Sequence, residues 1–308
     1  MKKISTLIFL IILASCSSNT TNRKYASDEQ LKLEDNYNWV DSLDFDKKAE
    51  TKYKADSDEF NTKKSDEQAN VLVKESISTL PAPRLDEQLK DSEDPLSKIV
   101  IKCYQNKYDE AFQIVDQIYS QFKNNTSYWN QVGTCYYLKG DYSKAVLFYN
   151  KSRDLDSKFA PPVNNLGVVY QKQGRYQKAL SAFKKASELN SFSITPSFNL
   201  ARLYLQFGII TKAEPIITGL GKRNSNDPQV MNALATVNLI KNNYSEAINI
   251  YSALPKDFLA RPEVALNYGL ALKFAKKNDE AKTAISNLSE ISGELKTYAS
   301  KVETFIRE

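Results

Sequence analysis

The chain has 308 residues, of which 42% are hydrophobic and 26% charged, and its formal net charge is +5. This is the composition of a folded protein with enough apolar residues for a sizeable core. The chain contains no histidine, which excludes serine–histidine and cysteine–histidine hydrolases and the commonest metal ligand, so we expect no enzyme, no metal and no cofactor.

Residues 1–15 have the pattern of a secretory signal peptide. Two lysines precede an apolar run over residues 4–14, which is too short to span a bilayer. The run ends in Leu-Ala-Ser-Cys at residues 13–16, which resembles the bacterial lipobox, where cleavage before the cysteine is followed by its lipidation. The resemblance implies a lipid anchor at Cys16, and the serine that follows implies the periplasmic face of the outer membrane. The alternative is an ordinary signal peptide with an incidental cysteine.

Residues 16–91 have the composition of a mostly disordered, acidic tether. Residues 17–95 hold 19 acidic and 12 basic side chains, whereas residues 96–308 hold 18 acidic and 28 basic ones. One apolar patch, Tyr37-Asn38-Trp39-Val40 with Leu43 and Phe45, interrupts the tether. We expect this patch either to be a short partner-binding motif or to dock on the basic part of the same chain.

Two columns of small residues repeat with a period of 34 in the rest of the chain. One consists of Gly133, Gly167, Ala201, Ala235 and Gly269, and the other of Ala111, Ala145, Ala179, Ala213, Ala247 and Ala281. A strict period of this length is typical of stacked-repeat proteins. Apolar residues recur at spacings of three and four on either side of turns such as Gly140-Asp141, which predicts two short amphipathic helices per unit.

The second and third units have the most regular pattern. Its residues are Trp129, Val132, Gly133, Tyr136, Ala145 and Tyr149, then Leu166, Gly167, Tyr170, Ala179, Phe183 and Ala186. This pattern resembles the tetratricopeptide repeat. The resemblance implies an all-α, right-handed solenoid of about six helix-turn-helix repeats over residues 92–291, which start near residues 92, 126, 160, 194, 228 and 262.

Three units depart from the pattern. Ile99 replaces the small residue of the first unit, Pro215 falls in the second helix of the fourth, and Pro255 shortens the fifth. The fourth unit is expected to end early, at Gly219 and Gly221.

The pattern of residues 292–308 predicts a capping helix after the last repeat, because a solenoid needs a polar cover at its exposed end. Its apolar face consists of Leu295, Tyr298, Val302 and Ile306.

Cys103 and Cys135 fall on the first helices of neighbouring units, 32 residues apart. Because this separation is two short of the period, their directions around the helices differ by roughly 200°, which allows facing as well as pointing apart. Helix axes lie about 8–10 Å apart, whereas a disulfide needs Cα atoms within about 7 Å. Two buried free thiols are therefore the safer interpretation, and a disulfide is the alternative.

A polar column also recurs on the first helices. Its members are Gln131, Asn165, Asn199 and Asn267, with Ala233 in the fifth unit. In some tetratricopeptide proteins an asparagine ladder at this place holds the backbone of an extended peptide, because a carboxamide is both donor and acceptor. The resemblance therefore implies peptide binding on the concave face, and the alternative is that these side chains are merely polar. Further candidates to contact the peptide are Tyr137, Gln171, Arg202, Leu205 and Lys273.

We expect a lipid-anchored periplasmic scaffold that binds other envelope proteins, and neither nucleic acid nor a small-molecule substrate. The chain is similar to six-repeat lipoproteins that assist the assembly of the type IV pilus secretin. The alternatives are an accessory lipoprotein of β-barrel assembly and an adaptor for peptidoglycan hydrolases. In a different class, the protein is a structural envelope protein that associates with itself.

Overall fold

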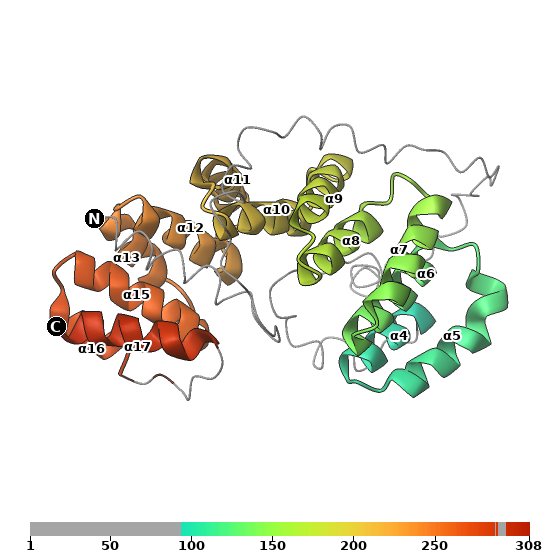
Figure 1. Ribbon diagram of the computed structural model, residues 1–308, viewed down its shortest axis with the longest axis horizontal. Coiled ribbons are helices and arrows are strands. Elements are labelled where there is room, and N and C mark those ends of the chain that lie inside the picture. Colours follow the sequence, from blue (N-terminus) through green and yellow to red (C-terminus); the bar gives the residue numbers. More distant parts are fainter. Residues whose placement is uncertain (1–93, 287, 289–293) are drawn as a thin grey trace. The chain divides into compact units, whose positions relative to one another are not determined.

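The computed structural model describes residues 94–286, 288 and 294–308, and in these residues every regular element is an α-helix (Figure 1). The described residues up to Asn199 form one compact unit, and those from Leu200 form a second. The predicted signal peptide (1–15), the predicted lipidation site Cys16, the predicted tether (16–91) and its apolar patch lie outside the described residues.

Six helices begin the repeats. They are α4 (Pro95–Tyr104), α6 (Thr126–Lys139), α8 (Ala160–Lys172), α10 (Ile194–Gln206), α12 (Pro228–Ile240) and α15 (Pro262–Phe274). The last five begin at the residues that the period predicts, which confirms the repeat. α4 begins slightly later than expected, because the Asp94 carboxylate caps it by accepting the Ser97 N–H (2.8 Å) and a proline occupies its first turn.

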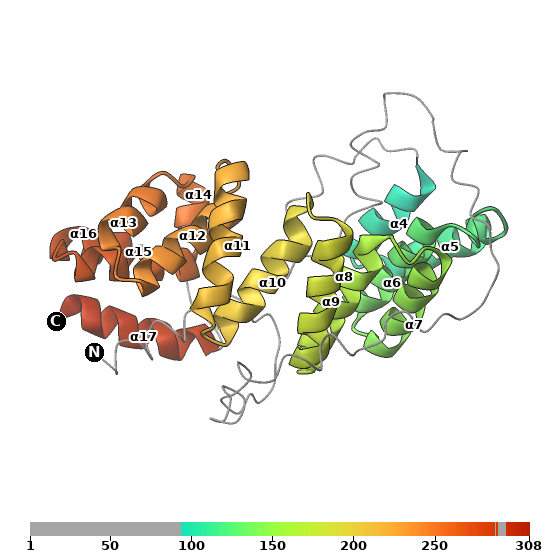
Figure 2. The ribbon, with the colours of Figure 1, turned by 90° about the horizontal axis from the view of Figure 1, so that it is seen from above.

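Six further helices follow the first ones after a tight turn. They are α5 (Tyr108–Phe122), α7 (Tyr142–Leu155), α9 (Tyr176–Leu189), α11 (Ile210–Arg223), α13 (Tyr244–Ser252) and α16 (Asn278–Ala284). Each of α7 and α9 packs on the first helix of its own repeat (Figure 2). α13 is short, as predicted from Pro255, and a single turn, α14 (Lys256–Leu259), comes after it. The all-α, helix-turn-helix prediction is confirmed.

The second helix of the fourth repeat is longer than expected. α11 continues through Pro215, Gly219 and Gly221 to Arg223, so the prediction that it ends early was wrong. Pro215 lies in the second turn, where it removes one backbone hydrogen bond. Packing against α12 compensates for this loss: Gly221 lies so close to Leu234 that an added Cβ would be 3.0 Å from its side chain.

The turn inside each repeat contains one residue in the left-handed region. These residues are again 34 apart: Asn106, Gly140, Gly174, Gly208, Asn242 and Lys276, with φ between 60° and 87°. Glycine and asparagine tolerate this conformation, whereas a longer side chain is strained in it. Two asparagines also accept a hydrogen bond from a tyrosine two residues later, Asn106 from Tyr108 (2.9 Å) and Asn242 from Tyr244 (2.6 Å).

The left-handed column predicts opposite effects for two substitutions. Gly140→Ala is expected to lower the free energy of unfolding by about 1 kcal/mol, because nothing lies within 4 Å of the added Cβ and only backbone strain acts. Lys276→Gly is expected to raise it by up to about 1 kcal/mol, because it relieves the same strain at φ 64°. Urea denaturation of both variants measures these changes, and a destabilised Lys276→Gly variant would contradict the explanation.

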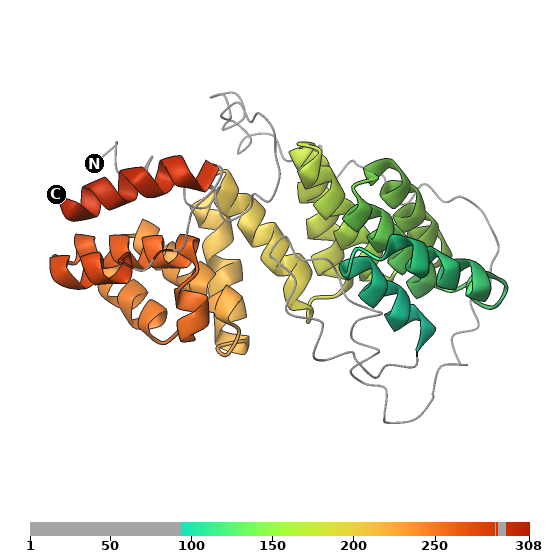
Figure 3. The ribbon, with the colours of Figure 1, turned by 90° about the horizontal axis from the view of Figure 1, so that it is seen from below.

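The last described helix, α17 (Glu294–Arg307), covers the end of the second unit (Figure 3). It packs on α15 and α16, and Tyr298, Val302 and Ile306 are buried in the same core as those helices. Lys296, Lys301 and Arg307 are exposed. The predicted capping helix is therefore confirmed, while the side chain of Leu295 lies outside the described residues.

Candidate peptide-binding surface

The structure places the predicted polar column on first helices, where its side chains are buried. Asn165 on α8 and Asn199 on α10 are fully buried, and Gln131 on α6 is 2% exposed. All three belong to the first compact unit, in which α4 packs on α6 and α6 on α8. Asn267 on α15 belongs to the second unit and is 4% exposed.

Four asparagines of the first unit form a continuous chain of hydrogen bonds across three repeats. The Asn165 Nδ2 atom donates to Asn130 Oδ1 (2.9 Å), and Asn164 Nδ2 donates to Asn165 Oδ1 (3.1 Å). Asn199 Nδ2 then donates to Asn164 Oδ1 (2.9 Å). The carboxamides therefore connect neighbouring repeats to one another, which is a structural role that the sequence analysis did not assign to them.

Asn130 and Asn164 are the residues that the sequence analysis missed. They directly precede the predicted column and are themselves 34 apart, so the period contained the signal. Asn130 Nδ2, at one end of the chain of hydrogen bonds, is buried without a hydrogen-bond partner. A buried donor without a partner costs about 1–3 kcal/mol of stability.

In the second unit, Asn267 supports a buried tyrosine. The Tyr251 hydroxyl is hydrogen-bonded to the side chains of Thr236 (3.0 Å) and Asn267. Because Thr236 donates its own proton to the Asn232 carbonyl (2.8 Å), Tyr251 donates to Thr236. Burial raises the pKa of Tyr251, which keeps this donor protonated. The Oδ1 atom of Asn267 has no hydrogen-bond partner.

The other candidate residues are divided between the two units. Tyr137 and Gln171 lie in the first unit, with the Tyr137 ring 5.9 Å from that of Tyr142, and Arg202, Leu205 and Lys273 lie in the second. Gln171, Arg202 and Leu205 are buried. Lys273 Nζ donates to the Ile306 carbonyl of α17 (3.2 Å), so in this structure it caps a helix. Peptide binding by these residues and by the asparagine column stays a prediction.

The asparagine chain predicts energetic coupling between adjacent repeats. Asn164→Ala and Asn199→Ala each remove one partner of the 2.9 Å hydrogen bond between them, and the second substitution then has less left to break. A double-mutant cycle by urea denaturation should give a coupling energy of about 1 kcal/mol. Purely additive effects would show that the two carboxamides do not depend on each other.

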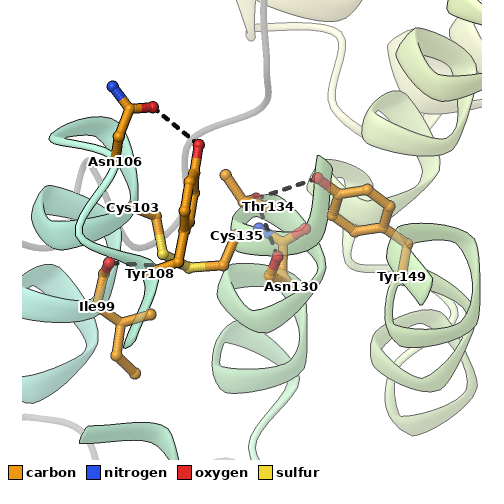
Figure 4. The surroundings of a disulfide bond; sticks show 8 residues. All are labelled: Ile99, Cys103, Asn106, Tyr108, Asn130, Thr134, Cys135 and Tyr149. Carbon is orange, nitrogen blue, oxygen red and sulfur yellow. Dashed lines mark hydrogen bonds between the residues drawn. A yellow bond between two sulfur atoms is a disulfide. The ribbon is translucent and has the colours of Figure 1, made fainter. Parts of the chain in front are cut away.

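Cys103 and Cys135 form a disulfide between α4 and α6 (Figure 4). Both cysteines are fully buried, and their Cα atoms are 5.2 Å apart. The interpretation as free thiols was therefore wrong. The error lies in the comparison with the axis spacing: each Cα lies about 2.3 Å off its axis, so facing Cα atoms of packed helices are several Å closer than the axes.

Among the described residues, no group of three or more histidine, cysteine, aspartate or glutamate side chains is arranged to hold a metal ion. None of the helices within the described ranges has both the length and the apolar character needed to cross a membrane.

The comparisons with known proteins identify the repeats. Sequence profiles of the tetratricopeptide repeat match residues 126–159 and 164–192. These are the two units in which the sequence pattern is most regular. No curated protein matches the chain by sequence.

Solved structures with the same fold include two with a TM-score of 0.57. One is a chain of the Cut9–Hcn1 hetero-tetramer of the APC/C, which is 20% identical; the similarity covers 71% of this chain but only 44% of that one. The other is PilF of Pseudomonas aeruginosa, which is 18% identical, with 67% of this chain and 96% of PilF covered. Identities this low show the fold alone. Tetratricopeptide repeats are in general interaction scaffolds and not enzymes, and they bind peptides or proteins in a concave groove.

Proposed function

Because residues 126–159 and 164–192 are tetratricopeptide repeats, we propose that this protein is a lipid-anchored scaffold that binds other envelope proteins. The observation that carries the proposal is the succession of first helices α6, α8 and α10, which the asparagine chain connects from one repeat to the next. The carboxamides of this chain are buried and bonded to one another, so they hold the first helices in register, and side chains beside them on these helices, such as Tyr137, would contact a ligand. The first helices of stacked repeats line an extended concave surface, which suits an extended polypeptide.

The disulfide supports a location outside the cytoplasm. Buried disulfides persist in oxidising compartments such as the periplasm, and they are rare in the cytosol, where thiols are kept reduced. A signal peptide over residues 1–15 and a lipidated Cys16 would deliver the chain to that compartment and hold it on the outer membrane. The cysteine pair and the lipobox are separate features of the sequence and support the same location.

The partner we propose is a protein of the type IV pilus machinery, and the role is assistance in secretin assembly. The support is the resemblance to six-repeat lipoproteins of that system, which share the lipobox, the number of repeats and the lack of histidine-dependent catalytic residues. A β-barrel assembly protein and a peptidoglycan hydrolase are the alternative partners, and self-association is the alternative of another class.

Site-specific photocrosslinking in cells tests both the surface and the partner. We expect a benzoylphenylalanine at Tyr137, on α6, to form an adduct with an envelope protein. The control position is Leu147 on α7, which is 62% exposed. The adduct identifies a secretin, a barrel-assembly protein, a hydrolase or a second copy of this chain. Identical adducts from both positions, or none from Tyr137, would contradict binding at the first helices.

The anchor is tested by fractionation. We expect Cys16→Ser to move the protein from the membrane fraction to the soluble periplasmic fraction, with loss of the lipid mass from its N-terminus. Ser17→Ala is the matched control and should stay in the membrane fraction. A Cys16→Ser protein that remains with the membrane would contradict the lipid anchor.

A further inference from the structure

One edge of the first unit carries an excess of positive charge. Within four residues of the left-handed turns of the second and third repeats there are five basic side chains and a single acidic one. We call this set the turn edge, and its members are Lys139, Lys144, Lys172, Arg175, Lys178 and Asp141. At the opposite ends of the same helices, residues 153–158 and 187–193 contain two basic and three acidic side chains. The charge is therefore concentrated at one end of these helices.

Three of the four lysines of the turn edge lie over aromatic rings. Lys139 Nζ lies 5.4 Å from the Phe112 ring of the preceding repeat. Lys144 Nζ lies 5.2 Å from the Tyr136 ring, and Lys178 Nζ lies 5.9 Å from the Tyr170 ring. All three lysines are nevertheless exposed. Contacts of this kind fix an ammonium group over apolar surface while one side of it stays in water.

The one carboxylate of the turn edge is already engaged. Asp141 caps α7 by accepting the Lys144 N–H (3.1 Å), and it lies 3.5 Å from Lys144 Nζ. With five basic side chains and this one carboxylate, the turn edge has a net charge of +4. A net positive charge over aromatic rings favours a ligand that is acidic and aromatic.

The same chain contains a segment with this composition. Residues 28–46 hold seven acidic side chains and one lysine, so their net charge of −6 accounts for nearly all of the net charge of −7 of residues 17–95. The segment also contains Tyr37, Trp39 and Phe45. Between Asp46 and the first described residue there are 47 residues. Even a random coil of that length has an end-to-end distance of about 35–40 Å, more than the roughly 21 Å length of α6.

We propose that residues 28–46 bind the turn edge of the second and third repeats of the same molecule. The acidic side chains pair with Lys139, Lys144 and Lys178, and the aromatic residues pack on the apolar surface between these lysines. This contact lies at the ends of the helices and is independent of the asparagine chain, so it stands or falls separately from the proposed function. Because the ion pairs are exposed, salt weakens the contact.

Zero-length carbodiimide crosslinking of the full chain, followed by mass spectrometry, tests the proposal. We expect crosslinks from carboxylates of residues 28–46 to Lys139, Lys144 and Lys178, with a yield that falls about tenfold at 1 M salt. A mixture of ¹⁴N- and ¹⁵N-labelled protein separates crosslinks within one molecule from crosslinks between two. Crosslinks only between molecules would overturn the proposal in favour of a second copy.

Two pairs of charge variants sharpen this test. Replacing Asp35, Asp41, Asp44 and Asp46 by asparagine should remove most of the crosslinks, whereas replacing Asp56, Asp58, Asp66 and Asp86 should leave them unchanged. Docking is also followed by the fluorescence of Trp39 in a Trp129→Phe background, where it is the only tryptophan. A triple variant should abolish the salt-sensitive docking of Trp39; it combines Lys139→Glu, Lys144→Glu and Lys178→Glu. Lys123→Glu, Lys151→Glu and Lys158→Glu are the matched control. If a test variant and its matched control had equal effects, the proposal would be overturned. Salt-sensitive binding of phosphatidylglycerol vesicles by the turn edge, without crosslinks to residues 28–46, would also overturn it.

Discussion

Replacing Cys103 and Cys135 together by alanine is expected to lower the free energy of unfolding of the first unit by about 3–4 kcal/mol. The disulfide closes a loop of 32 residues, and a cross-link of that span restricts the unfolded chain by roughly this amount. It joins α4 to α6 and therefore links the first repeat covalently to the more regular second one. The first repeat is the irregular one, because the large Ile99 takes the place of the small residue. Guanidinium denaturation followed by circular dichroism measures the change.

Two controls test this prediction: the change in stability that a reductant causes, and the helices in which amide hydrogen exchange rises. Dithiothreitol should destabilise the wild-type protein but leave the double-alanine variant unchanged. Amide hydrogen exchange should rise most in α4 and α5, which the disulfide holds against the rest of the unit. If the second unit lost as much protection as the first, the assignment of the disulfide to the first repeats would be wrong.

Gly167→Ala is expected to lower the free energy of unfolding by about 2–3 kcal/mol. An added Cβ would lie 2.7 Å from the Phe183 ring and 3.3 Å from the Ala179 carbonyl oxygen, and both neighbours are buried. Two helices that already touch have to separate, which is the usual cost of overpacking a core. Denaturation of the variant and of wild type measures the difference.

Gly219→Ala is the matched control for this prediction. Gly219 is also inside a helix, α11, but nothing lies within 4 Å of a Cβ added there. The substitution should therefore raise the stability by about 0.5–1 kcal/mol, because alanine loses less backbone entropy in a helix. In addition, Phe183→Leu should recover part of the loss caused by Gly167→Ala. A destabilised Gly219→Ala variant would show that a general intolerance of alanine explains both results.

For the candidate surface, the sequence predicted the positions of the polar side chains but not their hydrogen-bond partners. The period located Gln131, Asn165, Asn199 and Asn267 on the first helices, but it did not indicate whether these carboxamides point to a ligand or to one another. Which donor meets which acceptor depends on how adjacent repeats are displaced and rotated. In the first unit that geometry joins Asn164 and Asn130 to the column through hydrogen bonds of 2.9–3.1 Å.

The sequence by itself determined the helix pairs and the first residue of five of the six first helices, because the small residues, the apolar spacings and the turn residues are local signals that return every 34 positions. The tertiary structure alone decided three matters. The disulfide formed because α4 and α6 pack closely enough to bring two Cα atoms to 5.2 Å. α11 continued past Pro215 and two glycines because packing on α12 outweighs local helix propensity. The asparagines paired because the stacking of the repeats places each beside the next, a relation between segments about 34 residues apart that no single repeat contains.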